Sequence, residues 1–89
     1  MDLDKAFTAT ITKDAGKSGW TCVVWPESVR FFGTGKPVKV IGTVDGHDFQ
    51  ATFLPLGDGT HMLPLRAAVM TKIKKQVGEQ VEVHLRERL

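Results

Sequence analysis

The sequence lacks a second cysteine, a long apolar run and a basic, apolar leader. Cys22 is the only cysteine, so no disulfide forms within the chain, and Cys22 is most simply a small buried apolar side chain. No segment approaches the roughly 20 apolar residues that span a bilayer. Residues 1–5, MDLDK, carry two acids where a secretory signal has a basic start. These absences predict a cytoplasmic protein without a membrane segment.

Recognisable catalytic and metal-binding motifs are also missing. Residues 16–18, GKS, resemble the end of a phosphate-binding loop, but the first glycine of that motif would fall on Ile11, inside a predicted strand. No serine lies in a nucleophile elbow. The histidines lack the two- to four-residue spacing of a local metal site: His47, His61 and His84. The sequence therefore predicts no catalytic residue, no metal and no cofactor, and favours a protein that is not an enzyme.

Length and composition predict one globular domain over residues 1–89. Hydrophobic residues make up 42% of the chain and charged residues 25%, as in an ordinary folded domain. The formal net charge is +2, but residues 61–89 carry six basic and three acidic residues, whereas residues 1–60 carry six and seven. The last third is therefore the basic part.

Alternating apolar and polar residues predict that the first half begins with a half-buried strand, in which Phe7, Ala9 and Ile11 share one face. Pro26 stops the second strand, because it has no amide hydrogen for a sheet. The predicted elements are a strand over 6–13, a turn over 14–19, a strand over 20–25, a short helix or single turn over 27–32 and a strand over 38–44.

The second half begins at Asp45-Gly46, a pair typical of a type I′ hairpin. The apolar positions Leu65, Val69, Ile73 and Val77 recur at helical spacing and predict one longer helix that ends at Gly78. The other predicted elements are a strand over 47–54, a turn over 57–59, a strand over 60–64 that proline closes, and a strand over 81–86.

The two halves, about residues 5–45 and 46–89, show the same order of signals. Each has an alternating strand, a turn, a short strand that ends in proline, a helical segment, a glycine and a final strand. This order predicts an internal duplication. A lone half would expose sheet edges, so we expect both halves to close into a six-stranded double-split β-barrel, with the longer helix plugging one end.

The chain resembles the bacterial and archaeal family of domain of unknown function 1905. The residues that carry the resemblance are Gly19-Trp20, Val23 to Pro26, Val38-Lys39-Val40, the hairpin at 43–46, the GDGTH segment at 57–61, Leu63-Pro64 and Gly78 to Leu85. The resemblance implies a double-split β-barrel, the fold class that includes the AbrB and MazE-like proteins. It implies no activity, since none is known for the family.

A second, more distant resemblance is to the AbrB-type half-motif, through the spacing of Pro64, Gly78 and residues 81–83. Dimers of that type bind DNA through basic loops and arms. The present chain departs from the pattern, because it lacks an arginine-rich segment before its first strand and has Glu79 where the motif usually has aspartate.

His61 is the residue around which we look first for a function. It follows a tight turn and shortly precedes Leu63-Pro64, so its imidazole either braces the turn or contacts a ligand. Aromatic side chains could line a pocket beside it or simply fill the core. The predicted ligand-binding residues are Trp20, Trp25, Asp58, Thr60 and His61.

A stretch without acids carries four basic residues, Arg66, Lys72, Lys74 and Lys75. These side chains either contact a phosphate backbone or are solvated on an outer helix face. Fold analogy alone is a weak argument for nucleic-acid binding.

Three functional hypotheses follow. The first is a non-enzymatic module that binds a small molecule or a protein. The alternative is a nucleic-acid-binding protein of AbrB-like type, and the third is an accessory subunit or an enzyme with a site assembled around His61. We expect a monomer or a weak homodimer, because both halves lie in one chain.

Overall fold

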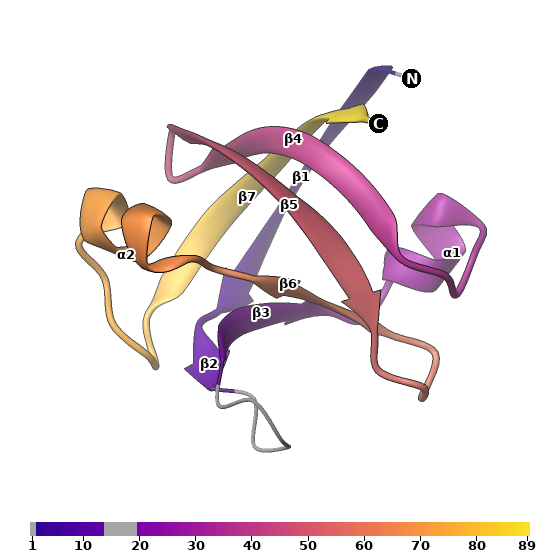
Figure 1. Ribbon diagram of the computed structural model, residues 1–89, viewed down its shortest axis with the longest axis horizontal. Helices are drawn as coiled ribbons and strands as arrows, with labels where there is room; N and C mark the ends of the chain where they lie inside the picture. The colour runs from indigo at the N-terminus through magenta and orange to yellow at the C-terminus, as the bar shows by residue number, and fades with distance from the viewer. Residues whose placement is uncertain (1, 14–19) are drawn as a thin grey trace.

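The computed structural model describes residues 2–13 and 20–89 as a mainly β domain (Figure 1). All strand pairs are antiparallel. The elements are β1 (Asp2–Thr10), β2 (Thr12–Lys13), β3 (Thr21–Trp25), α1 (Ser28–Phe32), β4 (Val38–Val44), β5 (His47–Pro55), β6 (His61–Pro64), α2 (Ala67–Ile73) and β7 (Gln80–Arg88). The turn predicted over 14–19 lies outside the described residues.

The strands form one curled sheet with the order β1-β7-β4-β5-β6-β3-β2. The predicted closed six-stranded barrel is therefore wrong: the sheet has seven strands in an open order and curls into a half-barrel (Figure 1). The strand count differs because the first predicted strand is divided at Ile11 into β1 and β2, which pair with different strands. Its N–H donates to Glu79 O at 2.8 Å beside β7, whereas the next residue, Thr12, pairs with Cys22 of β3.

The core lies inside the curl, and β4 and β7 each contribute three of its buried residues. The strand predicted over 81–86 lies within β7, where the alternating residues Val81, Val83 and Leu85 are at most 1% exposed. β4 and β7 shift register between Ile41 and Gly42. A Cβ on Gly42 would lie 2.1 Å from His84 O, so this crossing of the two strands requires glycine.

The hairpin between β4 and β5 has the predicted geometry. Asp45 and Gly46 both have positive φ, at 49° and 82°, as both central residues of a type I′ turn must. The register continues from Val44 opposite His47 to Val38 opposite Phe53. Phe49 and Phe53 of β5 belong to the core, with 8% and 0% exposure.

The prediction of a helix from Leu65 to Val77 is wrong at both ends. Leu65 lies before α2 in an extended segment, where its N–H donates to Thr21 O at 2.8 Å. α2 ends at Ile73, because Lys74 takes the left-handed conformation with φ 55°. Val77 is 50% exposed and lies outside the helix. α2 has seven residues and does not form the predicted plug.

Both helices are short in the described part of the chain. α1 has five residues and α2 has seven. No helix among the described residues is long and apolar enough to cross a membrane.

Candidate functional site

His61 begins β6 and is completely buried. Lys36 O lies 2.9 Å from Nε2 and can only accept, so Nε2 carries the hydrogen. Ser28 Oγ lies 2.7 Å from Nδ1 and donates to it, while it accepts the His61 backbone N–H at 3.0 Å. Each polar atom of the imidazole is therefore bonded to the protein, as expected for a histidine that braces the turn.

The Ser28–His61 pair has the chemical groups of a nucleophile and its base, but its surroundings do not suit catalysis. Both residues are 0% exposed. A serine nucleophile must reach a substrate carbonyl, and a base must exchange a proton with that reaction. Here Phe32 and Phe53 pack against the imidazole ring. Their ring centroids lie 6.1 and 6.2 Å from that of His61, both in edge-to-face arrangements.

Trp25 pairs with His61 in the register of β3 and β6, so the structure brings these two predicted ligand-binding residues together. Trp25 is only 4% exposed and stacks on Phe7 with 4.4 Å between ring centroids and 4° between planes. Phe31 and Phe32 of α1 pack against the Trp25 ring, with ring centroids 5.2 and 5.8 Å from its centroid. Trp25 thus lies in an aromatic cluster that fills the α1 end of the sheet.

Asp58 and Thr60 lie in the turn before β6, where Asp58 is exposed and Thr60 half-buried. The Thr60 N–H donates to Asp58 Oδ1 at 3.0 Å, and the Thr60 hydroxyl donates to the same oxygen. The hydroxyl, followed by the backbone amides, holds the pKa of Asp58 below its usual 3.8. Both side chains are engaged in shaping the turn.

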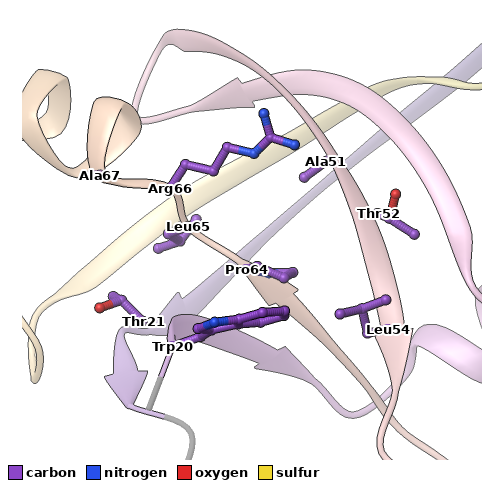
Figure 2. A pocket seen from close by; sticks show the side chains of 9 residues that line it. All are labelled: Trp20, Thr21, Ala51, Thr52, Leu54, Pro64, Leu65, Arg66 and Ala67. Carbon is purple, nitrogen blue, oxygen red and sulfur yellow. The ribbon is translucent and has the colours of Figure 1, made fainter. Parts of the chain in front are cut away.

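Trp20 lies apart from the other predicted ligand-binding residues, at the α2 end of the sheet. It is 50% exposed and forms one wall of a hollow of about 480 Å³ that we call the α2 groove (Figure 2). The lining residues are Trp20, Thr21, Ala51, Thr52, Leu54, Pro64, Leu65, Arg66 and Ala67. The groove combines apolar walls, two hydroxyl groups and one guanidinium.

The α2 groove exists because β5 and β6 separate. They pair only at Leu54 opposite Met62 and Pro55 opposite His61. The same register would place Thr52 opposite Pro64, which has no N–H to continue the ladder. The small Ala51 and Ala67 leave the space between the separated strands and α2 unfilled.

Arg66 extends from the start of α2 toward β5 in Figure 2. Its guanidinium has no hydrogen bond or ion pair with any residue in the described ranges 2–13 and 20–89. It borders both the α2 groove and an adjoining hollow of about 350 Å³ that Lys39 also lines. An anionic group in either hollow would meet this cation.

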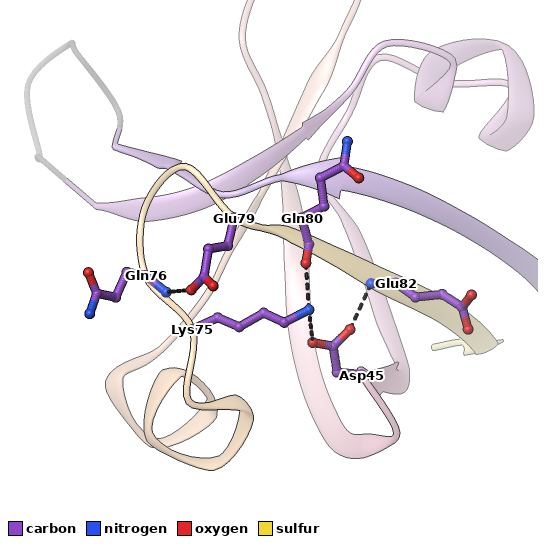
Figure 3. Close-up of polar contacts among 6 residues, drawn as sticks. All are labelled: Asp45, Lys75, Gln76, Glu79, Gln80 and Glu82. Carbon is purple, nitrogen blue, oxygen red and sulfur yellow. Dashed lines mark hydrogen bonds and ion pairs between the residues drawn. The ribbon is translucent and has the colours of Figure 1, made fainter.

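The four residues predicted to contact nucleic acid do not act alike. Lys75 forms an ion pair with Asp45 at 2.7 Å and donates to Gln80 O at 2.6 Å (Figure 3). Lys72 and Lys74 are exposed at the end of α2. Arg66 lines the groove. The structure thus uses one of these cations to fix the chain and leaves three on the surface.

The Asp45–Lys75 pair ties the β4–β5 hairpin to the loop after α2. Asp45 Oδ1 also accepts the Glu82 N–H at 2.9 Å (Figure 3). Partial burial works to raise the pKa of Asp45, but the hydrogen bonds from Lys75 and Glu82 and the charge of Lys75 together lower it below 3.8. Asp45 is therefore a structural carboxylate.

A further hollow, of about 660 Å³, crosses β4, β5 and β7 and is more polar. Its lining includes carboxylates and a guanidinium, namely Asp2, Asp48, Arg86 and Glu87. Charges of both signs are already present there, so this hollow favours no one ligand charge. No group of three His, Cys, Asp or Glu residues in the described part of the chain could hold a metal ion.

Sequence reasoning found Trp20 and Arg66 but assigned them to different sites, and it missed Thr52, Leu54 and Ala67. The signal for the groove was present in Pro64, which predicts where the strand ladder stops. The size of the groove depends on which side chains of β5, β6 and α2 meet there. The apolar alternation along a single strand does not reveal those contacts.

The described fold is a small curled β domain with two short helices and surface hollows that include the α2 groove. Its sequence matches the family described as Domain of unknown function (DUF1905) over residues 7–85. The chain therefore belongs to this family, as the resemblance implied. No curated protein matches it.

Proposed function

We propose that the protein is a non-enzymatic binding module whose ligand occupies the α2 groove. One observation carries the proposal: the groove of about 480 Å³ joins apolar walls to the guanidinium of Arg66. Ligand sites are commonly hollows of roughly 300–1,000 Å³ with apolar walls and a few polar groups that set orientation. The ligand class that fits is an apolar body with an anionic group.

Placing the ligand at the α2 groove moves the predicted site away from His61. Every polar atom of the His61 ring has a protein partner, and the ring is buried. The enzyme hypothesis would need a substrate to displace these contacts. Of the predicted ligand-binding residues, Trp20 stays in the proposal, and Arg66 joins it.

The proposal is tested with naphthalene-2-carboxylate and its neutral analogue 2-naphthylmethanol, titrated into the ¹⁵N-labelled domain. We expect saturable shifts at the Trp20 indole and the Leu54 and Ala67 amides, with weaker binding of the neutral compound. Ala67→Trp fills the groove and should abolish the shifts. The control is Ala68→Trp, an exposed position on the same helix that does not line the groove.

Two results would overturn this function. Shifts confined to residues outside the groove would place the probe elsewhere. Equal loss of binding in Ala67→Trp and Ala68→Trp would show that blocking the groove has no specific effect.

Nucleic-acid binding stays a prediction with a simple measurement. Real phosphate contacts weaken steeply with salt, so fluorescence anisotropy with a labelled DNA duplex should show salt-sensitive binding that Lys72→Glu reduces. Anisotropy that stays flat at low salt removes the hypothesis. Lys75 adds no support to the nucleic-acid hypothesis, because its charge is already paired with Asp45.

We also propose that the chain arose by internal duplication and belongs to the double-split class. If β1 and β2 are counted as one divided strand, the order strand, strand, helix, strand occurs twice. Corresponding strands pair with each other, β3 with β6 and β4 with β7. This arrangement supports a twofold relation between the halves.

A further inference from the structure

β5 has one edge that is only partly covered. β4 pairs with it at each residue from His47 to Phe53. On its other side, β6 pairs only at Leu54 and Pro55. An edge without a neighbouring strand presents backbone groups that another chain can bind. The stretch of β5 before Leu54 is such an edge.

The hairpin register shows which backbone groups face this open edge. In a two-residue hairpin the flanking pair, here Val44 and His47, exchanges hydrogen bonds, and bonded pairs then alternate. Odd-numbered residues of β5 therefore bond to β4. Consistent with this parity, the Leu56 N–H donates to Thr60 O on the other side at 2.9 Å. The N–H and C=O groups of Gln50 and Thr52 thus point to the open edge.

The α2 groove and the adjoining hollow meet at the same edge. They share Ala51, Thr52 and Arg66 in their linings. The groove offers apolar contact on Trp20 and Leu54, and the adjoining hollow offers a second cation. That cation is Lys39, which lies opposite Thr52 in the register of β4 and β5. Among residues 2–13 and 20–89, no acidic side chain lines either hollow.

We infer that the partner is an extended acidic peptide segment that adds as a strand to the open edge of β5. Its backbone bonds to Gln50 and Thr52, one apolar side chain enters the α2 groove, and a carboxylate binds Arg66 and Lys39. Strand addition draws affinity from main-chain bonds and specificity from pockets for side chains. The inference rests on the proposed function, because it uses the same groove.

The first test uses acetylated and amidated random heptapeptides displayed on beads and selected on the wild-type domain. We expect the bound peptides to be enriched in an acidic and an apolar residue. One selected peptide is then N-methylated on alternate residues, in two complementary registers. One register removes the peptide N–H groups that bond to Gln50 and Thr52, so it should lose about tenfold or more in affinity. The other register should bind nearly as before.

The second test changes the edge and its charge. Thr52→Pro removes an N–H that points to the open edge and leaves the β4 ladder intact, so we expect at least about a tenfold loss of peptide affinity. Arg66→Glu should also weaken binding, and replacing the peptide's acid by lysine should restore it. Lys72→Glu makes the same charge change on α2 outside the groove lining and should leave affinity unchanged.

The outcomes separate this inference from the proposed function. Binding of naphthalene-2-carboxylate without selection of any peptide would overturn strand addition and leave the groove as a small-molecule site. Equal sensitivity of both N-methylation registers would overturn it as well. If neither probe binds, both proposals fall. The methylated peptides are measured on the wild-type domain, so the test holds even if Thr52→Pro does not fold.

Discussion

The two ends of the sheet differ in how completely side chains fill them. At the α1 end, Trp25 stacks on Phe7 and is enclosed by Phe31 and Phe32. At the α2 end, the helix begins with two alanines, and the strands beside it separate around a hollow of about 480 Å³. Phe31 and Phe32 on α1 thus fill their end of the sheet, whereas the alanines at the start of α2 leave a hollow at the other end.

Polar groups at the two ends are also treated differently. Ser28 and His61 at the α1 end are buried and bonded to one another and to the backbone. Arg66 at the α2 end is exposed and has no bonding partner in the described ranges. Buried polar groups without partners are costly, whereas an exposed cation is free to bind an anion. The polar groups at the α1 end are thus partnered within the fold, whereas the cation at the α2 end lies unpartnered by any described residue beside the groove in which we propose that a ligand binds.

The strongest test of this comparison replaces one tryptophan at each end. Trp25→Ala should lower the free energy of unfolding by about 3–5 kcal/mol, as for other buried aromatic truncations. Trp20→Ala should lower it by about 1 kcal/mol or less, because half of Trp20 is exposed. Urea unfolding followed by circular dichroism measures both.

Binding should show the opposite order. Trp20→Ala removes a wall of the groove and should weaken naphthalene-2-carboxylate binding, whereas a folded Trp25→Phe should retain it. If Trp25→Ala does not fold, Trp25→Phe supplies the stability comparison. Equal losses of stability at the two positions would show that the ends do not differ as described.

His61→Ala tests the buried polar network. It removes the ring that bonds Ser28 Oγ and Lys36 O and leaves a cavity among aromatic side chains. We expect a loss of about 2–4 kcal/mol in the free energy of unfolding, measured by urea titration. Arg66→Ala is the control and should change stability by no more than about 0.5 kcal/mol. A stable His61→Ala with reduced ligand affinity would instead assign His61 to a binding site.

Much of the strand pattern could be predicted from local signals. β4 was predicted with its observed bounds, and the Asp45-Gly46 turn followed from the positive φ that its type requires. The end of α2 could not be predicted in this way. The apolar spacing continues to Val77, but Lys74 leaves the helical conformation in a residue type that rarely takes positive φ.

The division of the first strand at Ile11 was missed for a similar reason. The apolar alternation continues through Phe7, Ala9 and Ile11 without interruption. What divides the strand is a change of pairing partner, from β7 to β3, and a change of partner leaves no mark on the period of one strand. The candidate site depended on the same long-range contacts. The sequence leaves two interpretations of His61 open, a brace for the turn or a ligand contact, because its contacts with Ser28 and Lys36 come from distant parts of the chain.

The smallest expected effect concerns the ion pair between Asp45 and Lys75 at the α2 end. The corresponding polar contact at the α1 end is the buried hydrogen bond between Ser28 and His61. Because the pKa of Asp45 lies below its unfolded value of 3.8, its stabilising charge is fully present above that pH and is lost as the pH falls through the folded-state pKa. Asp45→Asn should therefore cost about 0.5–1 kcal/mol at neutral pH and low salt. Asparagine keeps an oxygen for the Glu82 N–H and tolerates positive φ, so the change reports the charge. The measurement is the urea midpoint of both proteins across the acid range. A difference that persists unchanged well below pH 3.8 would show that the ion pair does not stabilise the α2 end.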